Sequence, residues 1–426
     1  MKTIRTLFLV SSVGCLLVVS ALLAFAVNGS STEDLFRSLG ILTEVVHLVE
    51  TEYVDPLNDE ALALSLDAGL LESVERWAAA VPAERVAAYE QLLSSQPPFG
   101  LVIGGRLGSA AVRQALPGSP AAAAGLTTWE VIERVEGVNT RGRPLWQIRL
   151  ELRDLEDAGQ PVTLEVVDRN MEERREVVLE PMNWLNRPVE STELDAARIV
   201  EVTSLGPGAV EELEEALQGA DRLVLDLRHL AWGVESEAIA AADLFRSEGE
   251  LGRWVGRRAG EKAFEAGEHV LAPTMPVVLT GPETEGVGEI LAAALAGAGA
   301  ELVGWPTMGH APHMRFVHSG DLHLWIPVGQ WLRSDGEPIN GNGLEPTEQV
   351  DDADLEDEQD LVLERALEIL SSATKATRPS TRRPEAEHGA STALEAELAA
   401  EGTPVVGSDS GSRAARPGRR AVDAAF

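Results

Sequence analysis

The middle of the chain alternates strand-like and helical segments, and this alternation narrows the possible folds more than any other feature. We expect strands at residues 197–202, 223–227, 276–280 and 302–303, and helices at residues 208–218, 235–246 and 287–297. Such alternation predicts an α/β layer. Strand-like hairpins at residues 315–328 add an antiparallel part, and a last helix is expected at residues 356–370.

The two regions before this layer have different patterns. Residues 33–94 carry apolar positions at helical spacing, whereas residues 97–181 consist of short strand-like runs separated by Gly and Pro turns, with one helix near residues 145–155. The predicted domains are a membrane segment at 1–27, a helical N-terminal region at 28–95, a β-rich domain at 97–183, an α/β core at 190–372 and a disordered tail at 373–426.

Charge and cysteine content exclude several functional classes. The 426 residues include 35 Lys and Arg against 69 Asp and Glu, a formal net charge of −34. A surface this acidic repels phosphate backbones, so we expect no nucleic acid partner. The only cysteine is Cys15, which excludes an internal disulfide and a multi-cysteine metal site. No cofactor is predicted.

The N-terminus predicts export. Lys2 and Arg5 precede an apolar run from Leu7 to Val27, whose 21 residues can span a hydrocarbon core of roughly 30 Å. The run is either a signal anchor or a long signal peptide that is cleaved after Ala26. Both alternatives place the bulk of the chain outside the cytoplasm, either as a single-pass cell-membrane protein or as a periplasmic or secreted one.

The β-rich domain carries a recognisable pattern. The sequence GSPAAAAGL at residues 118–126, followed by VIERVEG at 131–137, is similar to the core signature of PDZ domains. The resemblance implies a peptide-binding groove in which N–H groups of a loop at Phe99 and Gly100 bind a terminal carboxylate. Leu101, Val102 and Ile103 would then form the strand edge that receives the peptide. The alternative is an edge strand with a degenerate loop that binds nothing.

Six motifs between residues 33 and 370 resemble, in order, those of the C-terminal processing peptidases, the S41-type tail-specific serine proteases. They are YVDP at 53–56, LVLDLR at 223–228, ADLF at 242–245, EILA at 289–292, GWPTMG at 304–309 and GNGLEP at 341–346. The resemblance implies an α/β (α+β) peptidase-like core with an inserted PDZ-like domain, behind a helical N-terminal region and a membrane segment.

The chemistry of that family is missing from this sequence. The family uses a serine at the start of a helix and a lysine that activates it. Gly286 falls at the serine position and His310 at the lysine position, and the family's glutamine and oxyanion turn fall at Met314 and Gly233. The whole chain contains three lysines, none of them near these positions: Lys2, Lys262 and Lys375.

These substitutions predict a pseudopeptidase, a non-catalytic relative that binds peptide segments or C-termini of exported proteins and scaffolds or regulates proteolysis. An active protease is a candidate partner. Two alternatives stay open: an active serine-type peptidase with a rearranged nucleophile such as Thr284, and a purely structural envelope protein.

Four histidines within 14 residues allow one further alternative, a zinc site with nearby glutamates. The residues concerned are His310, His313, His318, His323, Glu283, Glu285 and Glu289. Their spacing fits no familiar metal signature, and along one strand His318 and His323 would point to opposite faces. We therefore expect no metal.

Overall fold

The computed structural model describes residues 37, 40–54, 62, 66, 69–71, 74, 75, 77–258, 260–267, 270–271, 274–319, 322–350 and 360–377. The predicted membrane segment and all of the predicted tail after Thr377 lie outside these residues. Among the helices that are described, none is both long enough and apolar enough to cross a bilayer.

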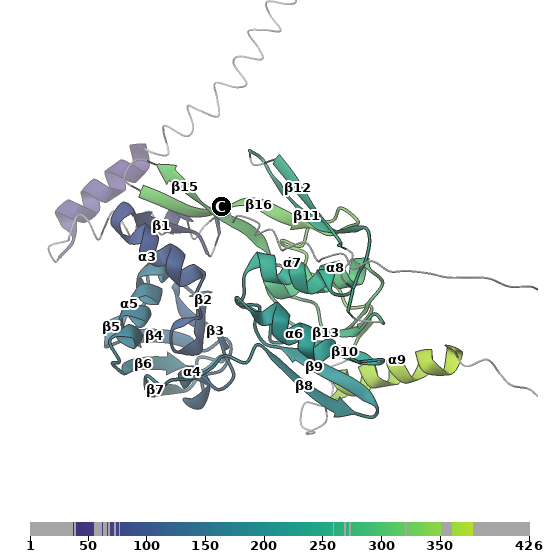
Figure 1. Ribbon diagram of the computed structural model, residues 1–426. Coiled ribbons are helices and arrows are strands. Elements are labelled where there is room, and N and C mark those ends of the chain that lie inside the picture. The colour runs from purple at the N-terminus through teal and green to yellow at the C-terminus, as the bar shows by residue number, and fades with distance from the viewer. Residues whose placement is uncertain are drawn as a thin grey trace, which may run out of the picture. The chain divides into compact units, whose positions relative to one another are not determined.

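The predicted α/β layer is present as a six-stranded sheet (Figure 1). Its strands lie in the order β17-β14-β13-β10-β9-β8, and only β8 runs antiparallel to its neighbour. Their bounds are β8 Val189–Leu194, β9 Ala197–Val202, β10 Leu223–Asp226, β13 Val277–Thr280, β14 Glu301–Gly304 and β17 Glu348–Gln349. The sequence did not predict β8, a mostly exposed edge strand with few apolar residues.

Both faces of this sheet are covered by helices. Along β10, Leu223 and Leu225 pack in the cluster formed with α6 (Ala209–Leu217), α7 (Glu235–Asp243) and α8 (Val287–Gly297). Val224, between them, packs in the cluster formed with α9 (Leu361–Thr377). Successive strand side chains point to opposite faces, so α6, α7 and α8 lie on one face and α9 on the other. The predicted last helix is present, and it continues into the predicted tail as far as Thr377.

A second sheet, antiparallel, forms what we call the 98–179 module. Its order is β2-β3-β4-β6-β7, with β5 paired to β4, so β2 is an edge strand. The strands are β2 Leu101–Arg106, β3 Ser109–Ala115, β4 Val131–Val135, β5 Val138–Asn139, β6 Val162–Val167 and β7 Arg174–Leu179. The expected helix of the GSPA sequence is α4 (Pro120–Ala123), in which the Ser119 hydroxyl accepts a hydrogen bond from the Ala122 N–H at 3.2 Å.

The long helix of the module, α5 (Leu145–Asp157), is packed on two sides. Ile148 and Leu152 face the sheet of the module. Trp146 and Leu150 face a cluster that includes Tyr89 of α3 (Ala83–Leu93). The segment before the module therefore holds α5 from the side that faces away from the module's sheet.

A third sheet joins segments that are distant in sequence. It is formed by β1 (Ala79–Pro82), β11 (Glu250–Gly256), β12 (Gly260–Glu265), β15 (Pro312–Ser319) and β16 (Leu322–Leu332). The prediction of helix throughout residues 33–94 was wrong at β1, because Ala79–Pro82 pairs with residues 322–325 of β16. Helical residues 40–52 and α3 agree with that prediction.

Candidate functional site

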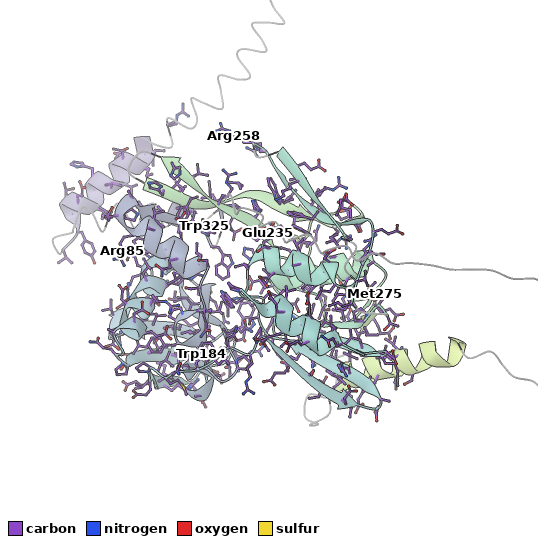
Figure 2. All side chains as sticks on the ribbon, viewed as in Figure 1. Arg85, Trp184, Glu235, Arg258, Met275 and Trp325 are labelled. Carbon is purple, nitrogen blue, oxygen red and sulfur yellow. The ribbon has the colours of Figure 1, made fainter. Side chains whose placement is uncertain are left out.

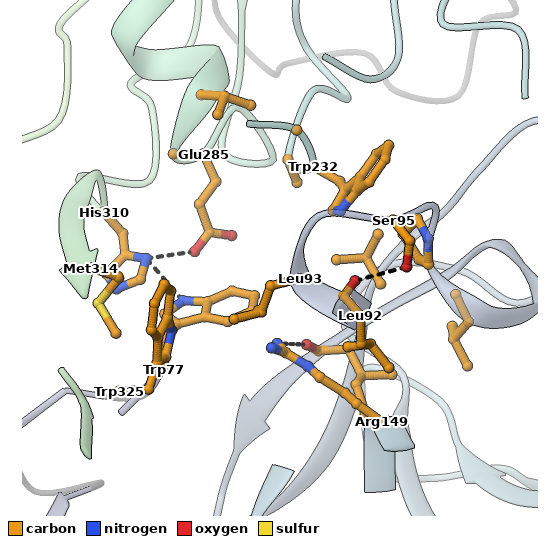
Figure 3. A pocket seen from close by; sticks show the side chains of 18 of the residues that line it. Trp77, Leu92, Leu93, Ser95, Arg149, Trp232, Glu285, His310, Met314 and Trp325 are labelled. Carbon is orange, nitrogen blue, oxygen red and sulfur yellow. Dashed lines mark hydrogen bonds and ion pairs between the residues drawn. The ribbon is translucent and has the colours of Figure 1, made fainter. Parts of the chain in front are cut away.

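A single cavity of about 230 Å³ is lined by residues from both predicted sites. Leu101, Val102 and Ile103 of β2 form part of its wall, and the four positions of the missing chemistry also line it: Gly233, Gly286, His310 and Met314. Figure 3 shows this cavity from close by. Phe99 and Gly100 do not line it.

Gly286 is the N-cap of α8, where the family resemblance places the nucleophile. Its backbone angles, φ 58° and ψ −110°, favour glycine. Its N–H donates to the His310 carbonyl oxygen at 3.0 Å and to Glu289 Oε2 at 3.2 Å. A Cβ built here would have the His310 carbonyl oxygen, 3.9 Å away, as its nearest contact. The position therefore has room for a side chain but carries none.

Glu289 fixes the His310 loop to the start of α8. Its buried carboxylate accepts hydrogen bonds from Thr307 Oγ1 at 2.5 Å, from Gly309 N at 2.6 Å and from His310 N at 2.8 Å. Burial raises the pKa of Glu289, and these hydrogen bonds offset the effect only in part. The positions predicted for the nucleophile and the base therefore lie next to each other.

The imidazole of His310 lies between two carboxylates. Its Nε2 is 2.6 Å from Glu75 Oε1, and its Nδ1 is 2.9 Å from Glu285 Oε1. Burial alone lowers the pKa of His310, but the hydrogen bonds to Glu285 and Glu75 outweigh burial and raise it. We assign a proton to each ring nitrogen, so that both donate to carboxylates and no lone pair is left to act as a general base.

Trp77 covers this ring from one side. The two rings stack with centroids 5.9 Å apart, and Trp77 Nε1 lies 3.0 Å from His310 Nδ1. A nitrogen that donates to Glu285 cannot also accept from Trp77, so we assign the Nδ1 proton to Glu285, the charged partner. Trp77 therefore contributes its ring face to the packing around His310.

Arg113 of β3 extends the ion pair into the 98–179 module. Its Nε donates to Glu285 Oε2 at 3.0 Å, a second guanidinium N–H contacts the same oxygen, and both side chains are about 97% buried or more. Burial raises the pKa of Glu285. The interactions with His310 and Arg113 lower it by more than burial raises it, so the net shift is downward. Arg113, Glu285, His310 and Glu75 therefore form one continuous charged chain, here called the buried charge chain.

The predicted oxyanion turn is bonded to the neighbouring loop. The Val234 N–H donates to the Leu205 carbonyl oxygen at 2.8 Å, and the Leu205 N–H donates to Trp232 O at 2.9 Å. A Cβ at Gly233 would lie 2.5 Å from that same Leu205 oxygen. Met314 carries a thioether, which donates no hydrogen bond.

The hydroxyl groups of Thr284 and Ser95 both have structural hydrogen-bond partners. Thr284 is fully buried, and its hydroxyl donates to the Leu227 carbonyl oxygen at 2.8 Å and accepts from the Gly281 N–H at 3.0 Å. Ser95, which sequence reasoning missed, lines the cavity and donates to the Leu92 carbonyl oxygen at 3.2 Å. Figure 3 places Ser95 across the cavity from His310. Neither hydroxyl is arranged as a nucleophile beside a base.

Comparison with known proteins agrees with this geometry. Residues 199–350, which run from within β9 to the end of β17 and include the predicted catalytic positions, match peptidase family S41. This stretch is a family S41 peptidase domain.

The chain is also similar to proteins that carry processing-protease names. It is 23% identical over 320 residues to the carboxy-terminal processing protease CtpA of Bacillus subtilis (strain 168), covering 72% of this chain and 67% of that protein. It is 27% identical over 287 residues to a carboxyl-terminal-processing protease of Synechocystis sp., covering 63% and 66%. The chain thus spans about two thirds of the length of these relatives.

A solved structure shares the fold. The photosystem II D1 C-terminal processing protease superposes with a TM-score of 0.58 at 20% identity, over 72% of this chain and 86% of that one. The chain therefore shares the mixed α/β, peptidase-like fold of that protease.

The histidines outside the buried charge chain lie in separate pairs. His313 Nδ1 pairs with Glu235 at 2.8 Å, and His229 Nδ1 pairs with Glu283 at 2.9 Å. The prediction that His318 and His323 point to opposite faces was wrong, because they lie on two paired strands and their Nδ1 atoms are 2.5 Å apart. Within the described residues, no three His, Cys, Asp or Glu side chains are grouped to hold a metal ion.

The predicted carboxylate loop differs from expectation in one respect. β2 lies at the sheet edge as expected, but the loop N–H groups are not free. The Phe99 N–H donates to Glu156 Oε1 at 2.6 Å, and the Gly100 N–H donates to the Pro97 carbonyl oxygen at 2.9 Å. On β2 itself, the Ile103 carbonyl oxygen accepts from Arg149 at 2.7 Å. The sequence could not show these partners, which come from α5 and from the turn before β2.

Proposed function

We propose that this protein is a non-catalytic S41 relative that binds extended peptide segments. The observation that carries the proposal is the shared cavity, in which the β2 edge lies beside the predicted catalytic positions while these positions lack a nucleophile and a free base. A chain that keeps the substrate groove of a peptidase and loses its chemistry retains binding as its function.

The case against catalysis rests on three features of the site. Gly286 has no side chain, so covalent catalysis at the start of α8 has no attacking atom. His310 donates to two carboxylates and cannot take a proton from a hydroxyl. The charged side chains of the site pair with one another, because Glu285 is the common partner of Arg113 and His310. Such pairs stabilise the fold and do not take part in a reaction.

The case for peptide binding rests on the walls of the cavity. They are mainly apolar, with Leu92, Leu93, Val102, Trp232 and Trp325 among the lining residues. An edge strand next to apolar pockets is the arrangement by which proteins bind extended peptides through strand addition. The PDZ-like sequence pattern of the 98–179 module adds to this support.

The location and partners follow from the sequence and form part of the proposal. Residues 7–27 direct export, with a single-pass anchor or a cleaved signal peptide as the two alternatives. Peptide segments or C-termini of exported proteins are then the available ligands, and an active protease is the partner that a scaffold for proteolysis would serve.

The names of the relatives favour a second candidate, an active peptidase. The Bacillus and Synechocystis relatives are named as processing proteases. In this chain such an activity requires a nucleophile at a position other than 286. The buried Thr284 hydroxyl makes two hydrogen bonds, and these would first have to break. Labelling by a hydroxyl-directed covalent probe distinguishes this candidate from the first.

Fluorescence anisotropy with labelled apolar peptides of about ten residues tests the proposal on the full chain. Leu93→Lys places a charge in the cavity wall and should weaken binding by about tenfold or more, which is roughly 1.4 kcal/mol. Leu185→Lys, at a leucine that is 80% exposed and outside the cavity, is the matched control and should bind as the wild type does. Failure of every peptide to bind more tightly than about 1 mM would refute the binding function.

A further inference from the structure

The loop that should bind a peptide carboxylate already holds a carboxylate of the chain itself. Glu156, in the last turn of α5, reaches the loop before β2, where its Oε1 accepts the Phe99 N–H at 2.6 Å. A charge-assisted bond of this kind is the interaction that a carboxylate-binding loop would offer to the end of a peptide. Glu156 therefore stands where a ligand's terminal carboxylate would be expected.

The remaining N–H groups of the loop are also paired. The Gly100 N–H donates to the Pro97 carbonyl oxygen at 2.9 Å, and the Leu101 N–H donates to the Pro98 carbonyl oxygen. Gly100 is also closely packed, since a Cβ there would meet the Ser119 side chain at 2.1 Å and the Trp184 ring at 3.0 Å. Trp184 is labelled in Figure 2. A second carboxylate thus finds no N–H donor at Phe99, Gly100 or Leu101.

Glu156 is held in this position from its other side. Arg153, one turn earlier on α5, donates to Glu156 Oε2 at 2.7 Å and also contacts the Gln96 carbonyl oxygen. Both side chains are about four-fifths buried. The Arg153 guanidinium thus contacts both Glu156 and the Gln96 backbone. Because of this second contact, it holds the Glu156 carboxylate against the loop and does not draw it toward solvent.

We propose that Glu156 is a specificity residue that closes the loop to chain ends, so that the groove binds internal extended segments that have no terminal carboxylate nearby. The proposal rests on the peptide-binding function above and specifies its ligand class. An internal segment needs only the strand edge and the apolar wall at Leu92, Leu93 and Val102. A chain end would bring a second negative charge beside Glu156 with no donor to compensate it.

Three forms of one apolar peptide test this on the full chain: the free acid, the C-terminal amide, and the same sequence extended at its C-terminus by several polar residues. Wild type should bind the amide and the extended form at least as tightly as the acid. In Glu156→Ala the Phe99 N–H is released, so the acid should gain about tenfold over the amide, the effect of one charge-assisted hydrogen bond.

Two further variants separate occupancy of the loop from a general effect on α5. Glu156→Gln keeps an acceptor for the Phe99 N–H, so its acid and amide affinities should stay within about threefold of each other. Glu151→Ala, which removes a carboxylate of α5 that pairs with Arg143 at 2.6 Å, should leave the wild-type ratio unchanged.

The outcomes separate the two proposals. A wild type that prefers the acid over the amide by about tenfold, or a folded Glu156→Ala variant whose ratio does not change, overturns the role of Glu156 while peptide binding stands. If wild type binds none of the three forms, peptide binding itself fails, and this inference fails with it. Should Glu156→Ala not fold, the wild-type ratio alone decides.

Discussion

At the residue scale, the buried charge chain links His310, the predicted base position, to Glu75 on one side and to Glu285 and Arg113 on the other. Arg113 is the member that the sequence predicts least, because nothing near it in the mostly apolar strand β3 indicates which residue it pairs with. Its pairing with Glu285 links the 98–179 module to the start of α8. Ion pairs this deeply buried are costly to break from one side, since the remaining charge is left without a partner.

Glu285→Gln tests the weight of this chain. The variant leaves the Arg113 guanidinium without a charged partner in a buried site, and should lower the free energy of unfolding by about 3–5 kcal/mol. Chemical denaturation measures the change. The matched control is Glu165→Gln, which removes half of the exposed Arg134–Glu165 pair and should cost about 0–1 kcal/mol. Equal losses in the two variants would contradict the account.

The raised pKa of His310 predicts a pH dependence of stability. A group whose pKa is higher in the folded than in the unfolded protein stabilises the fold fully below its unfolded pKa, about 6.5 for histidine. That contribution is lost as the pH rises through the folded-state pKa. The difference in unfolding free energy between wild type and His310→Gln should therefore be largest below about pH 6.5 and shrink as the pH rises through the folded-state pKa of His310. A difference that grows with pH would be inconsistent with a charged His310.

At the element scale, the local pattern predicted the central layer well. Strands β9, β10, β13 and β14 and helices α6, α7 and α8 lie within three residues of their expected bounds, because their apolar periodicity is strong. Strands β1, β11 and β12 were missed. Their partners lie far along the chain, as with β1 and β16, and pairing of this kind is decided by tertiary contacts and leaves little trace in local periodicity.

The start of α8 makes a prediction about two nearby glycines. Gly286→Ser should cost about 1–3 kcal/mol because of its positive φ, although its Cβ would enter open space. Gly288→Ser should cost more, because a Cβ there would lie 2.5 Å from the Leu230 carbonyl oxygen. Thermal unfolding of both variants checks the order, and a more stable Gly288→Ser variant would contradict it.

The loop before β2 also shows which substitution is uninformative. Gly100 has φ 66°, whereas proline fixes φ near −65°, so Gly100→Pro would disrupt the loop whether or not it binds peptides. Substitutions at Glu156 act on the same loop without touching its backbone.

At the scale of the whole molecule, the motif order assigned Gly286 and His310 to the nucleophile and base positions but did not predict what surrounds them. The bonds that decide their chemistry join residues far apart: Arg113 and Glu285 are separated by 172 positions, and Glu75 and His310 by 235. No local pattern reports such contacts, and the same holds for Phe99 and Glu156, 57 positions apart.

Restoring one catalytic group should not restore activity. Gly286→Ser supplies a hydroxyl, but His310 still donates to Glu75 and Glu285 and cannot accept its proton. Nucleophile and base act as a unit, so we expect peptide hydrolysis by Gly286→Ser to stay at the level of the wild type. Turnover in this variant alone would show that His310 or another group can act as a base.

Hydrolysis by the unmodified chain is the most direct test of the central claim that this S41 relative is not a peptidase. The full chain is incubated with an unfolded protein that carries an apolar C-terminal tail, and the products are identified by mass spectrometry. The account predicts no fragments beyond those of the substrate incubated alone. Reproducible fragments that are lost in Thr284→Ala, or on addition of a chelator, would contradict it and would identify the group responsible.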